Sequence, residues 1–81
     1  MDFIKMPIIG GTYRHYKGGL YRVLALARHS ETLAQMVVYE ALYENQLGQT
    51  WVRPAEMFLE EVNVAGVLTP RFQPVPPPST L

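Results

Sequence analysis

Two histidines and one glutamate of this sequence could meet at one end of the fold and carry out acid–base chemistry. His29 and Glu31 stand two positions apart, so an extended strand would place both on one face, and His15 lies in an earlier segment. Histidine titrates near neutral pH and is a common metal ligand, so the three could support a minimal acid–base or metal-assisted enzyme. The competing interpretation is a turn in which Ser30 and Thr32 bond to the backbone.

The sequence lacks the other groups that such chemistry needs. It has no cysteine, no histidine pair at helical spacing, and no nucleophile arranged with a base and an orienting group. Neither glycine pair is followed by the lysine and hydroxyl residue of a phosphate-binding loop. We therefore predict no catalytic residue, no metal site and no cofactor, and the enzyme is kept as the alternative function.

Aromatic and basic residues alternate in two segments, a pattern typical of binding surfaces. Tyr13, His15 and Lys17 form the first segment, and Trp51 and Arg53 repeat the combination in the second. Proteins bind single-stranded nucleic acid through aromatic side chains that lie beside cationic ones. A groove lined by aromatic side chains also suits an extended peptide. The predicted ligand-binding residues are Tyr13, His15, Lys17, Tyr39, Trp51 and Arg53, with His29 and Glu31 at the rim. The alternative is that these rings fill the core of a small domain.

Opposite charges are separated along the chain. Residues 3–30 carry five basic side chains and no acidic one, whereas residues 31–62 carry six glutamates and Arg53. Either neighbouring strands pair these charges, or the first hairpin forms a basic surface that attracts an anion. Arg53 itself could clamp a carboxylate or phosphate, or it could pair with Glu31 or Glu40.

Length and net charge narrow the class of protein. The chain has 81 residues and a formal net charge of zero, which predicts one small domain and disfavours nucleic-acid binding. No apolar run approaches the ~20 residues that cross a bilayer, and the first residues lack the features of a signal peptide. We therefore expect a cytoplasmic protein with no membrane partner. A domain of about 60 residues hides only ~60 % of its unfolded surface, so association into a homodimer is one way to bury more.

Alternating apolar and polar residues predict that strands dominate the fold. Residues 13–17 and 20–29 are two strands joined at Gly18-Gly19, a tight hairpin that places residue 17 opposite 20 and residue 15 opposite 22. Residues 35–43 are predicted as a third strand because branched and aromatic residues fit a pleated surface, with a helix as the alternative.

The second half of the chain adds a short helix to this pattern. Residues 50–53 form a fourth strand that Pro54 stops, and Pro54 could also open a helical turn. Residues 58–62 are a fifth strand or the continuation of that helix. The prediction is a mostly β fold, a small SH3-like five-stranded antiparallel barrel with one short helical turn before the last strand.

Proline and glycine set the predicted limits of the domain. Four of the seven prolines, Pro74, Pro76, Pro77 and Pro78, fall in the last nine residues, and proline neither donates to a sheet nor continues a helix. The predicted layout is a flexible N-terminal segment over residues 1–10, a single β-barrel domain over residues 11–72, and a proline-rich disordered tail over residues 73–81.

A set of short phrases carries a family resemblance over about residues 12–72. They are Tyr13-Arg14-His15-Tyr16-Lys17-Gly18, His29-Ser30-Glu31-Thr32, Val38-Tyr39, Trp51-Val52-Arg53-Pro54, Met57-Phe58 and Arg71-Phe72. In this order and spacing the chain resembles the small bacterial family catalogued as domain of unknown function 1653. The resemblance implies a compact, mostly β, stand-alone bacterial module and no established activity.

We conclude from the sequence that this is a small non-catalytic binding module. Its partner class is left open between a peptide or protein and an anionic nucleotide or single-stranded nucleic acid. The two interpretations differ in their main contact, because peptide binding should depend on Trp51 and nucleic-acid binding on cations such as Lys17.

Overall fold

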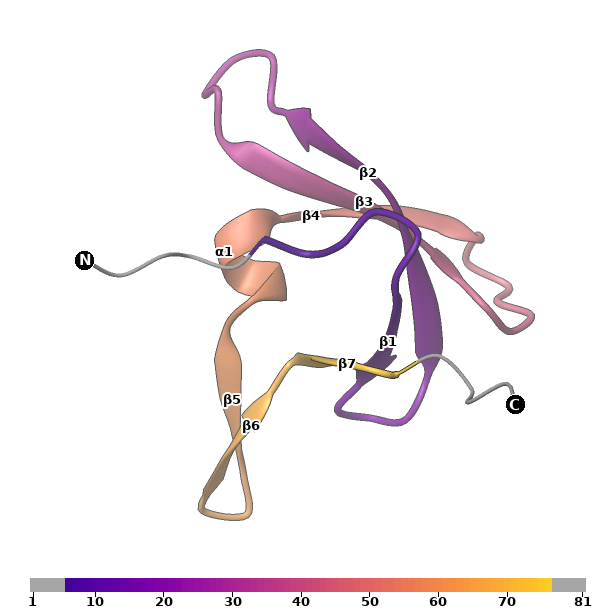
Figure 1. The fold of residues 1–81 in the computed structure, drawn as a ribbon, viewed down its shortest axis with the longest axis vertical. Helices are drawn as coiled ribbons and strands as arrows, with labels where there is room; N and C mark the ends of the chain where they lie inside the picture. Colours follow the sequence, from indigo (N-terminus) through magenta and orange to yellow (C-terminus); the bar gives the residue numbers. More distant parts are fainter. Residues whose placement is uncertain (1–5, 77–81) are drawn as a thin grey trace.

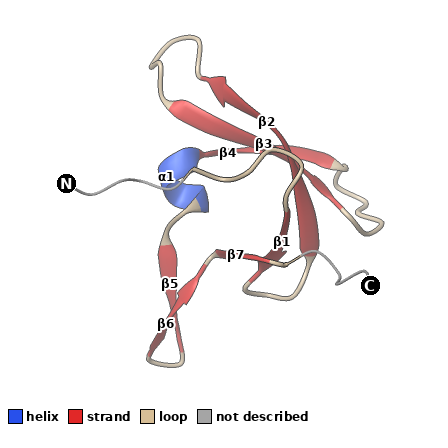
Figure 2. Ribbon diagram, in the orientation of Figure 1, coloured by secondary structure: helices blue, strands red, loops and turns tan. Residues whose placement is uncertain are grey.

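The computed structural model describes residues 6–76 of the chain, and strands dominate this part (Figures 1 and 2). The mostly β class predicted from the sequence is confirmed. The elements in chain order are β1 (Thr12–His15), β2 (Leu20–Arg28), β3 (Gln35–Ala41), β4 (Thr50–Pro54), α1 (Ala55–Phe58), β5 (Glu61–Val64), β6 (Val67–Pro70) and β7 (Phe72–Pro74).

The strands form one antiparallel sheet and a separate hairpin. The sheet has five strands in the order β4-β3-β2-β1-β7, and β5 pairs only with β6 in the described part of the chain. Because β4 and β7 are the two edges and do not pair with each other within residues 6–76, the sheet does not close into the barrel that we predicted. Three strands, rather than one, follow the helical turn.

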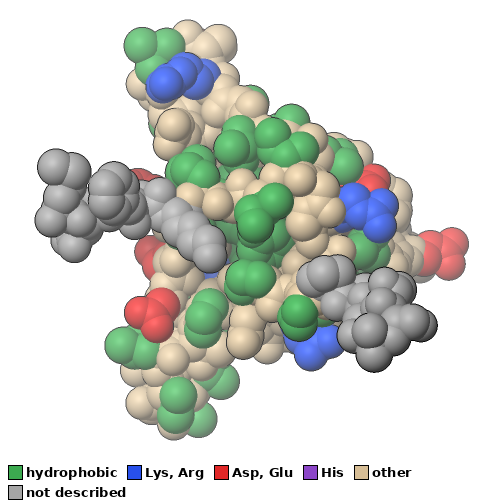
Figure 3. Space-filling view, in the orientation of Figure 1, with side chains coloured by type: hydrophobic (Ala, Val, Ile, Leu, Met, Phe, Trp, Pro, Cys, Tyr) green, Lys and Arg blue, Asp and Glu red, His purple; other side chains and the backbone are tan. Residues whose placement is uncertain are grey.

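The additional strands arise from a turn that the sequence pattern did not separate. Gly66 has a φ of +84°, which glycine adopts without strain, and its amide donates to Oδ1 of Asn63 at 2.8 Å. This turn folds residues 61–70 back on themselves as a hairpin that extends away from the sheet (Figure 1). Hydrophobic side chains gather at its tip in Figure 3, where Val67 and Leu68 are exposed.

The first hairpin forms at the predicted glycines but in a different register. Arg14 lies opposite Leu20 and Thr12 opposite Arg22, so the predicted pairing of residue 15 with residue 22 is wrong. The loop is longer than expected because the Tyr16 amide donates to the Arg71 carbonyl at 2.9 Å, next to β7. Tyr16 therefore does not extend the pairing of β1 with β2. Gly18 supplies the positive φ of the turn, at +112°.

The central pair of strands confirms the predicted third strand. Residues 35–41 pair with β2, so the helical alternative is wrong. A register shift between Val23 and Ala25 bends β2, as expected for a bulge. On the outer face, Arg22 lies directly opposite Glu40, and the two form a cross-strand ion pair with a 3.6 Å separation.

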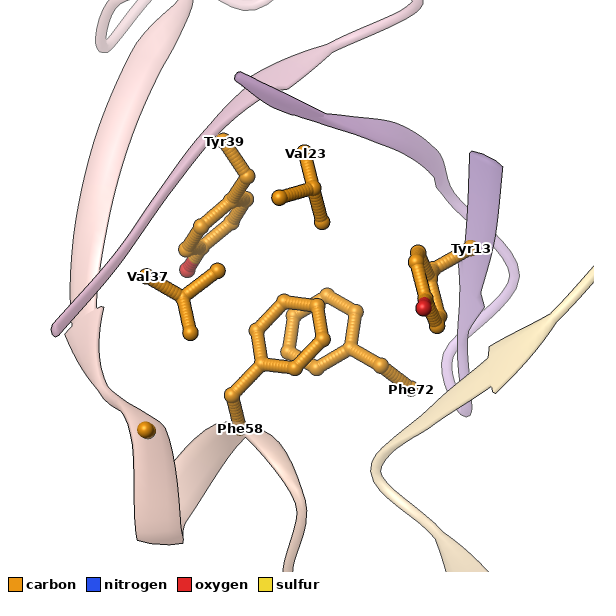
Figure 4. Packing of buried hydrophobic residues seen from close by; sticks show 7 residues of the cluster. Tyr13, Val23, Val37, Tyr39, Phe58 and Phe72 are labelled. Carbon is orange, nitrogen blue, oxygen red and sulfur yellow. The ribbon is translucent and has the colours of Figure 1, made fainter. Parts of the chain in front are cut away.

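The core lies between the inner face of the sheet and α1. Figure 4 shows that Phe58 of α1 lies face to face with Phe72 of β7, and their ring centres are 4.0 Å apart. The buried core residues are Tyr13, Val23, Val37, Tyr39, Ala55, Phe58 and Phe72. Pro54 is the N-cap of α1, so the predicted start of a helical turn at this proline is confirmed.

Residues on either side of the predicted domain limits also make contacts. Met6 packs against the core, and the Gly10 amide donates to the Val23 carbonyl at 2.8 Å. β7 extends to Pro74, which lies opposite Tyr13, and the next amide, of Val75, donates to Thr12. The outer parts of the two predicted flexible ends, residues 1–5 and 77–81, lie outside the described residues. Within residues 6–76, no helix has the length and apolarity to cross a bilayer.

Candidate binding site

A hollow of about 220 Å³ opens on the inner face of the sheet, beside the core. The strand register places Trp51 opposite Tyr39 and Arg53 opposite Val37, so the side chains of all four residues share the face that α1 partly covers. The part of this face that forms the hollow is lined by His15, Tyr21, Tyr39, Asn45, Leu47, Trp51, Arg53 and Phe72. Its walls are therefore mostly aromatic.

Arg53 supplies the positive charge of the hollow. Its Nε donates a hydrogen bond to the Tyr39 hydroxyl at 3.3 Å, and its Cζ lies 5.8 Å from the centre of the Phe72 ring. Among residues 6–76 no carboxylate lies within 4.0 Å of this guanidinium. The predicted alternative, a pair with Glu31 or Glu40, does not form, because Glu40 faces Arg22 on the other side of the sheet.

Trp51 and the loop before it form the rim. The indole Nε1 donates to the Gly48 carbonyl at 3.0 Å. The loop is held by Asn45, whose Oδ1 accepts from the Leu47 amide at 3.0 Å, and by Gln49, whose Oε1 accepts from the Asn45 amide at 3.1 Å. These bonds fix the loop while the Leu47 side chain stays 85 % exposed at the edge of the hollow.

His15 also lines the hollow and is mainly neutral at pH 7. Its ring centre lies 4.9 Å from that of Phe72, and its Nδ1 accepts from the Lys17 amide at 3.2 Å, which leaves the proton of the neutral ring on Nε2. Burial lowers the pKa of His15 below 6.5, and the nearby positive charges of Arg53, Arg71 and Lys17 lower the pKa further.

Tyr21 lines the hollow beside the His15 ring and carries a neutral hydroxyl. Its hydroxyl group hydrogen-bonds to that of Tyr43. Burial, and then this bond, raises the pKa of Tyr21 to about 12, so the group does not ionise near neutral pH. None of the eight lining residues is acidic. In the described part of the chain the hollow therefore combines one cation with uncharged rings, an environment that favours an anion attached to an apolar or planar group.

Comparison with known proteins places the chain in a family. The family model described as "Protein of unknown function (DUF1653)" matches residues 11–74. The chain belongs to the DUF1653 family. It is also similar to the crystal structure of a DUF1653 protein from Bordetella bronchiseptica, with 35 % identity, a TM-score of 0.77, and coverage of 99 % of this chain and 96 % of that chain. None of the curated proteins matches the chain. The resemblance noted in the sequence is thus confirmed.

The fold of this DUF1653 chain brings four of the predicted binding residues together. His15, Tyr39, Trp51 and Arg53 all line the hollow. Tyr13 does not, because it is 6 % exposed and packs edge-on against Phe58 in the core. Lys17 lies in the turn after β1, where its Nζ is 5.8 Å from the centre of the Tyr16 ring, and it is not among the lining residues.

His29 and Glu31 lie at the other end of the sheet from the hollow. His15 bonds to Gly19 at one end of β2, and His29 follows the other end. The first and last of the nine strand residues are eight steps of ~3.3 Å apart, which puts roughly 26 Å between the two ends. Nδ1 of His29 accepts the amide of Glu31 at 3.1 Å, so this histidine organises a turn. The three groups of the alternative enzyme do not meet, and residues 6–76 contain no cluster of three metal-ligating side chains.

Four lining residues were not among those predicted. Tyr21 could have been found, because it stands two positions before the apolar Val23, and alternate residues of a strand share one face. Leu47 had a weaker signal, since a large apolar residue in a polar loop is unusual. Asn45 and Phe72 had none: they reach the hollow through a loop conformation and through the pairing of β7 with β1.

Proposed function

We propose that this DUF1653 protein is a non-catalytic binding module. Its hollow takes a ligand in which a carboxylate, phosphate or similar anion lies next to an apolar or planar group. The observation that carries this proposal is the Arg53 guanidinium, which lies in an aromatic-walled hollow without a carboxylate partner among residues 6–76.

Electrostatics supports an anion as one half of the ligand. A partly buried cation loses hydration, and an opposite charge compensates for this loss when it binds. The guanidinium presents several N–H donors in a plane, which match the two oxygens of a carboxylate or phosphate. Within residues 6–76 the guanidinium of Arg53 is hydrogen-bonded only through Nε, to the Tyr39 hydroxyl, so its terminal nitrogens can donate to the ligand.

The rim supports an apolar or planar group as the other half. The Trp51 nitrogen is already bonded to Gly48, so the face and edge of its ring are what a ligand contacts. Leu47 adds an exposed apolar side chain. Since the loop is held by its own hydrogen bonds, little conformational entropy would be lost when a ligand binds.

The fluorescence of Trp51 tests this function directly, because Trp51 is the single tryptophan of the chain. We would titrate the full chain with phenyl phosphate, phenylacetate and benzenesulfonate, and with benzyl alcohol as an uncharged control. We expect a saturable change with the anions and at least about tenfold weaker binding in Arg53→Gln, since charged hydrogen bonds contribute roughly 1.5–3 kcal/mol.

Arg22→Gln is the matched control variant. It removes the same charge from the outer face of the sheet, where Arg22 pairs with Glu40, and should bind the anions as the natural chain does. Equal binding by Arg53→Gln and Arg22→Gln would overturn the proposal. No saturable change with any of the three anions would overturn it as well.

A further inference from the structure

The hollow adjoins a sheet edge whose backbone is unpaired. β4 is the last strand of the sheet order, so one of its two sides lacks a neighbouring strand in the described part of the chain. The Ala41 amide donates to the Gln49 carbonyl at 2.8 Å, which fixes the alternation of the antiparallel ladder. In this register the backbone groups of Trp51 and Arg53 point toward β3, and those of Thr50 and Val52 point away from the sheet.

Side chains of the same strand alternate between the hollow and the outer face. Trp51 and Arg53 line the hollow, whereas the intervening Val52 is 58 % exposed on the outer face. β4 therefore presents the backbone N–H and C=O of Val52 at its open edge, between the two side chains that dominate the hollow.

We propose that the ligand of this hollow is an extended acidic peptide segment that pairs with β4 as an added antiparallel strand. The inference rests on the proposed function of the hollow. The peptide residue opposite Val52 exchanges two backbone hydrogen bonds with it. The residues on either side of that peptide residue then project onto the inner face, one beside Arg53 and the other beside Trp51.

This register defines a short recognition pattern. From its N-terminus, a peptide strand antiparallel to β4 passes Arg53 before Trp51. The acidic residue therefore comes first in the peptide, and the apolar residue follows two positions later, beside Trp51 and toward Leu47. The pattern is acidic, any residue, apolar. Pro54 ends the usable edge because proline has no N–H to donate, which limits the paired segment to a few residues.

Charge and hydrogen bonding favour a peptide over a nucleic acid. Among residues 6–76 the hollow has one cation, and the chain has no net charge, whereas a nucleic-acid strand needs many phosphate contacts. A nucleotide would also leave the backbone groups of Val52 without a partner. The other edge of the sheet is a poorer platform, because β7 has three residues and ends at Pro74.

Four blocked peptides test the proposal by Trp51 fluorescence on the full chain. The first is acetylated and amidated Ser-Glu-Thr-Leu-Ser, and the second carries Gln in place of Glu. The third exchanges Glu and Thr, which moves the acid to the outer face, and the fourth is N-methylated on the Thr amide. We expect the first to bind at least about tenfold more tightly than each of the others. Equal binding of the exchanged or methylated peptide would overturn the proposal.

A protein variant tests the same backbone contact from the other side. Val52→Pro removes the outward amide without removing a bond to β3, and Val52→Ala is its control because it keeps that amide. We expect Val52→Pro to lose the peptide and to retain phenyl phosphate. If Val52→Pro does not fold, as judged by circular dichroism, the methylated peptide still decides the question.

The outcomes separate this inference from the proposed function. Binding of the aromatic anions through Arg53, with no preference for the first peptide, would overturn the peptide and leave the function standing. If neither the anions nor the peptides bind, both fall. Tighter binding of a ten-nucleotide oligothymidine than of the first peptide would identify a single-stranded nucleic acid and overturn the peptide.

Discussion

Arg53 and Phe72 join the two edges of one sheet. The Cζ atom of Arg53, on β4, lies 5.8 Å from the centre of the Phe72 ring, on β7, although these strands stand at opposite ends of the strand order. The sheet therefore curls until its edges meet through side chains without backbone pairing between them. The hollow lies where this contact brings the inner-face residues of the two edges together.

The stacked pair of phenylalanines should determine the stability of the domain. Phe58 is 1 % exposed and its ring lies 4.0 Å from that of Phe72. We expect Phe58→Ala to lower the free energy of unfolding by about 3–5 kcal/mol, and Phe58→Leu by about 1 kcal/mol, in urea titrations followed by Trp51 fluorescence. A loss below about 1 kcal/mol in Phe58→Ala would show that α1 does not complete the core.

Protonation of His15 should strengthen anion binding. The folded pKa of His15 is below 6.5, so the ring is neutral at pH 7 and gains a positive charge beside the ligand as the pH falls below 6.5. We expect tighter binding of benzenesulfonate, whose own charge is constant, between pH 7 and about pH 5. His15→Gln should abolish this dependence, and a dependence of equal size in that variant would contradict the assignment.

The same shift predicts that acid destabilises the fold. Because the folded pKa is lowered, the unfolded chain binds the proton more readily, and stability present above pH 6.5 is lost as the pH falls below this value. Urea titrations of the natural chain and of His15→Gln at pH 7.5 and pH 5.5 would measure the effect. The natural chain should lose more stability than the variant over this interval.

Tyr21 should respond to alkali in the opposite sense. Its folded pKa is raised to about 12, above the ordinary value of 10, so stability is lost as the pH rises from 10 toward 12. Absorbance at 295 nm should show the late ionisation of Tyr21. Tyr43→Phe removes the hydroxyl partner and should lower this late pKa without restoring it fully, because burial is the larger cause. An unchanged titration curve in Tyr43→Phe would contradict the pairing.

Local sequence patterns predicted the strands well and their registers less well. Alternation around Val37 and Tyr39, the turn at Gly18 and the stop at Pro54 are local signals, and each element formed where expected. The register of the first hairpin depends on the bond from Tyr16 to Arg71, which are distant in sequence. No local pattern contains that information.

The homodimer expected from the length of the chain stays a prediction, which sedimentation velocity would test.

The candidate site was predictable only in part for the same reason. His15, Tyr39, Trp51 and Arg53 were selected by type, and the fold brings them together. Tyr13 was selected on equal grounds, but Phe58 of the short helix covers it. Residue type shows what a side chain can bind. Whether it is accessible depends on contacts between segments that are far apart in the chain.

A nuclear magnetic resonance titration of the full chain with benzenesulfonate would show whether the anion binds beside Arg53. The side-chain N–H signals of Trp51 and Arg53 report on two neighbouring residues of β4 that line the hollow. If benzenesulfonate binds in this hollow, both signals should shift together and saturate at the same ligand concentration, and in Arg53→Gln the Trp51 shift should require at least about tenfold more ligand. Binding that leaves both signals unmoved, or that persists unchanged in Arg53→Gln, would contradict the proposed site.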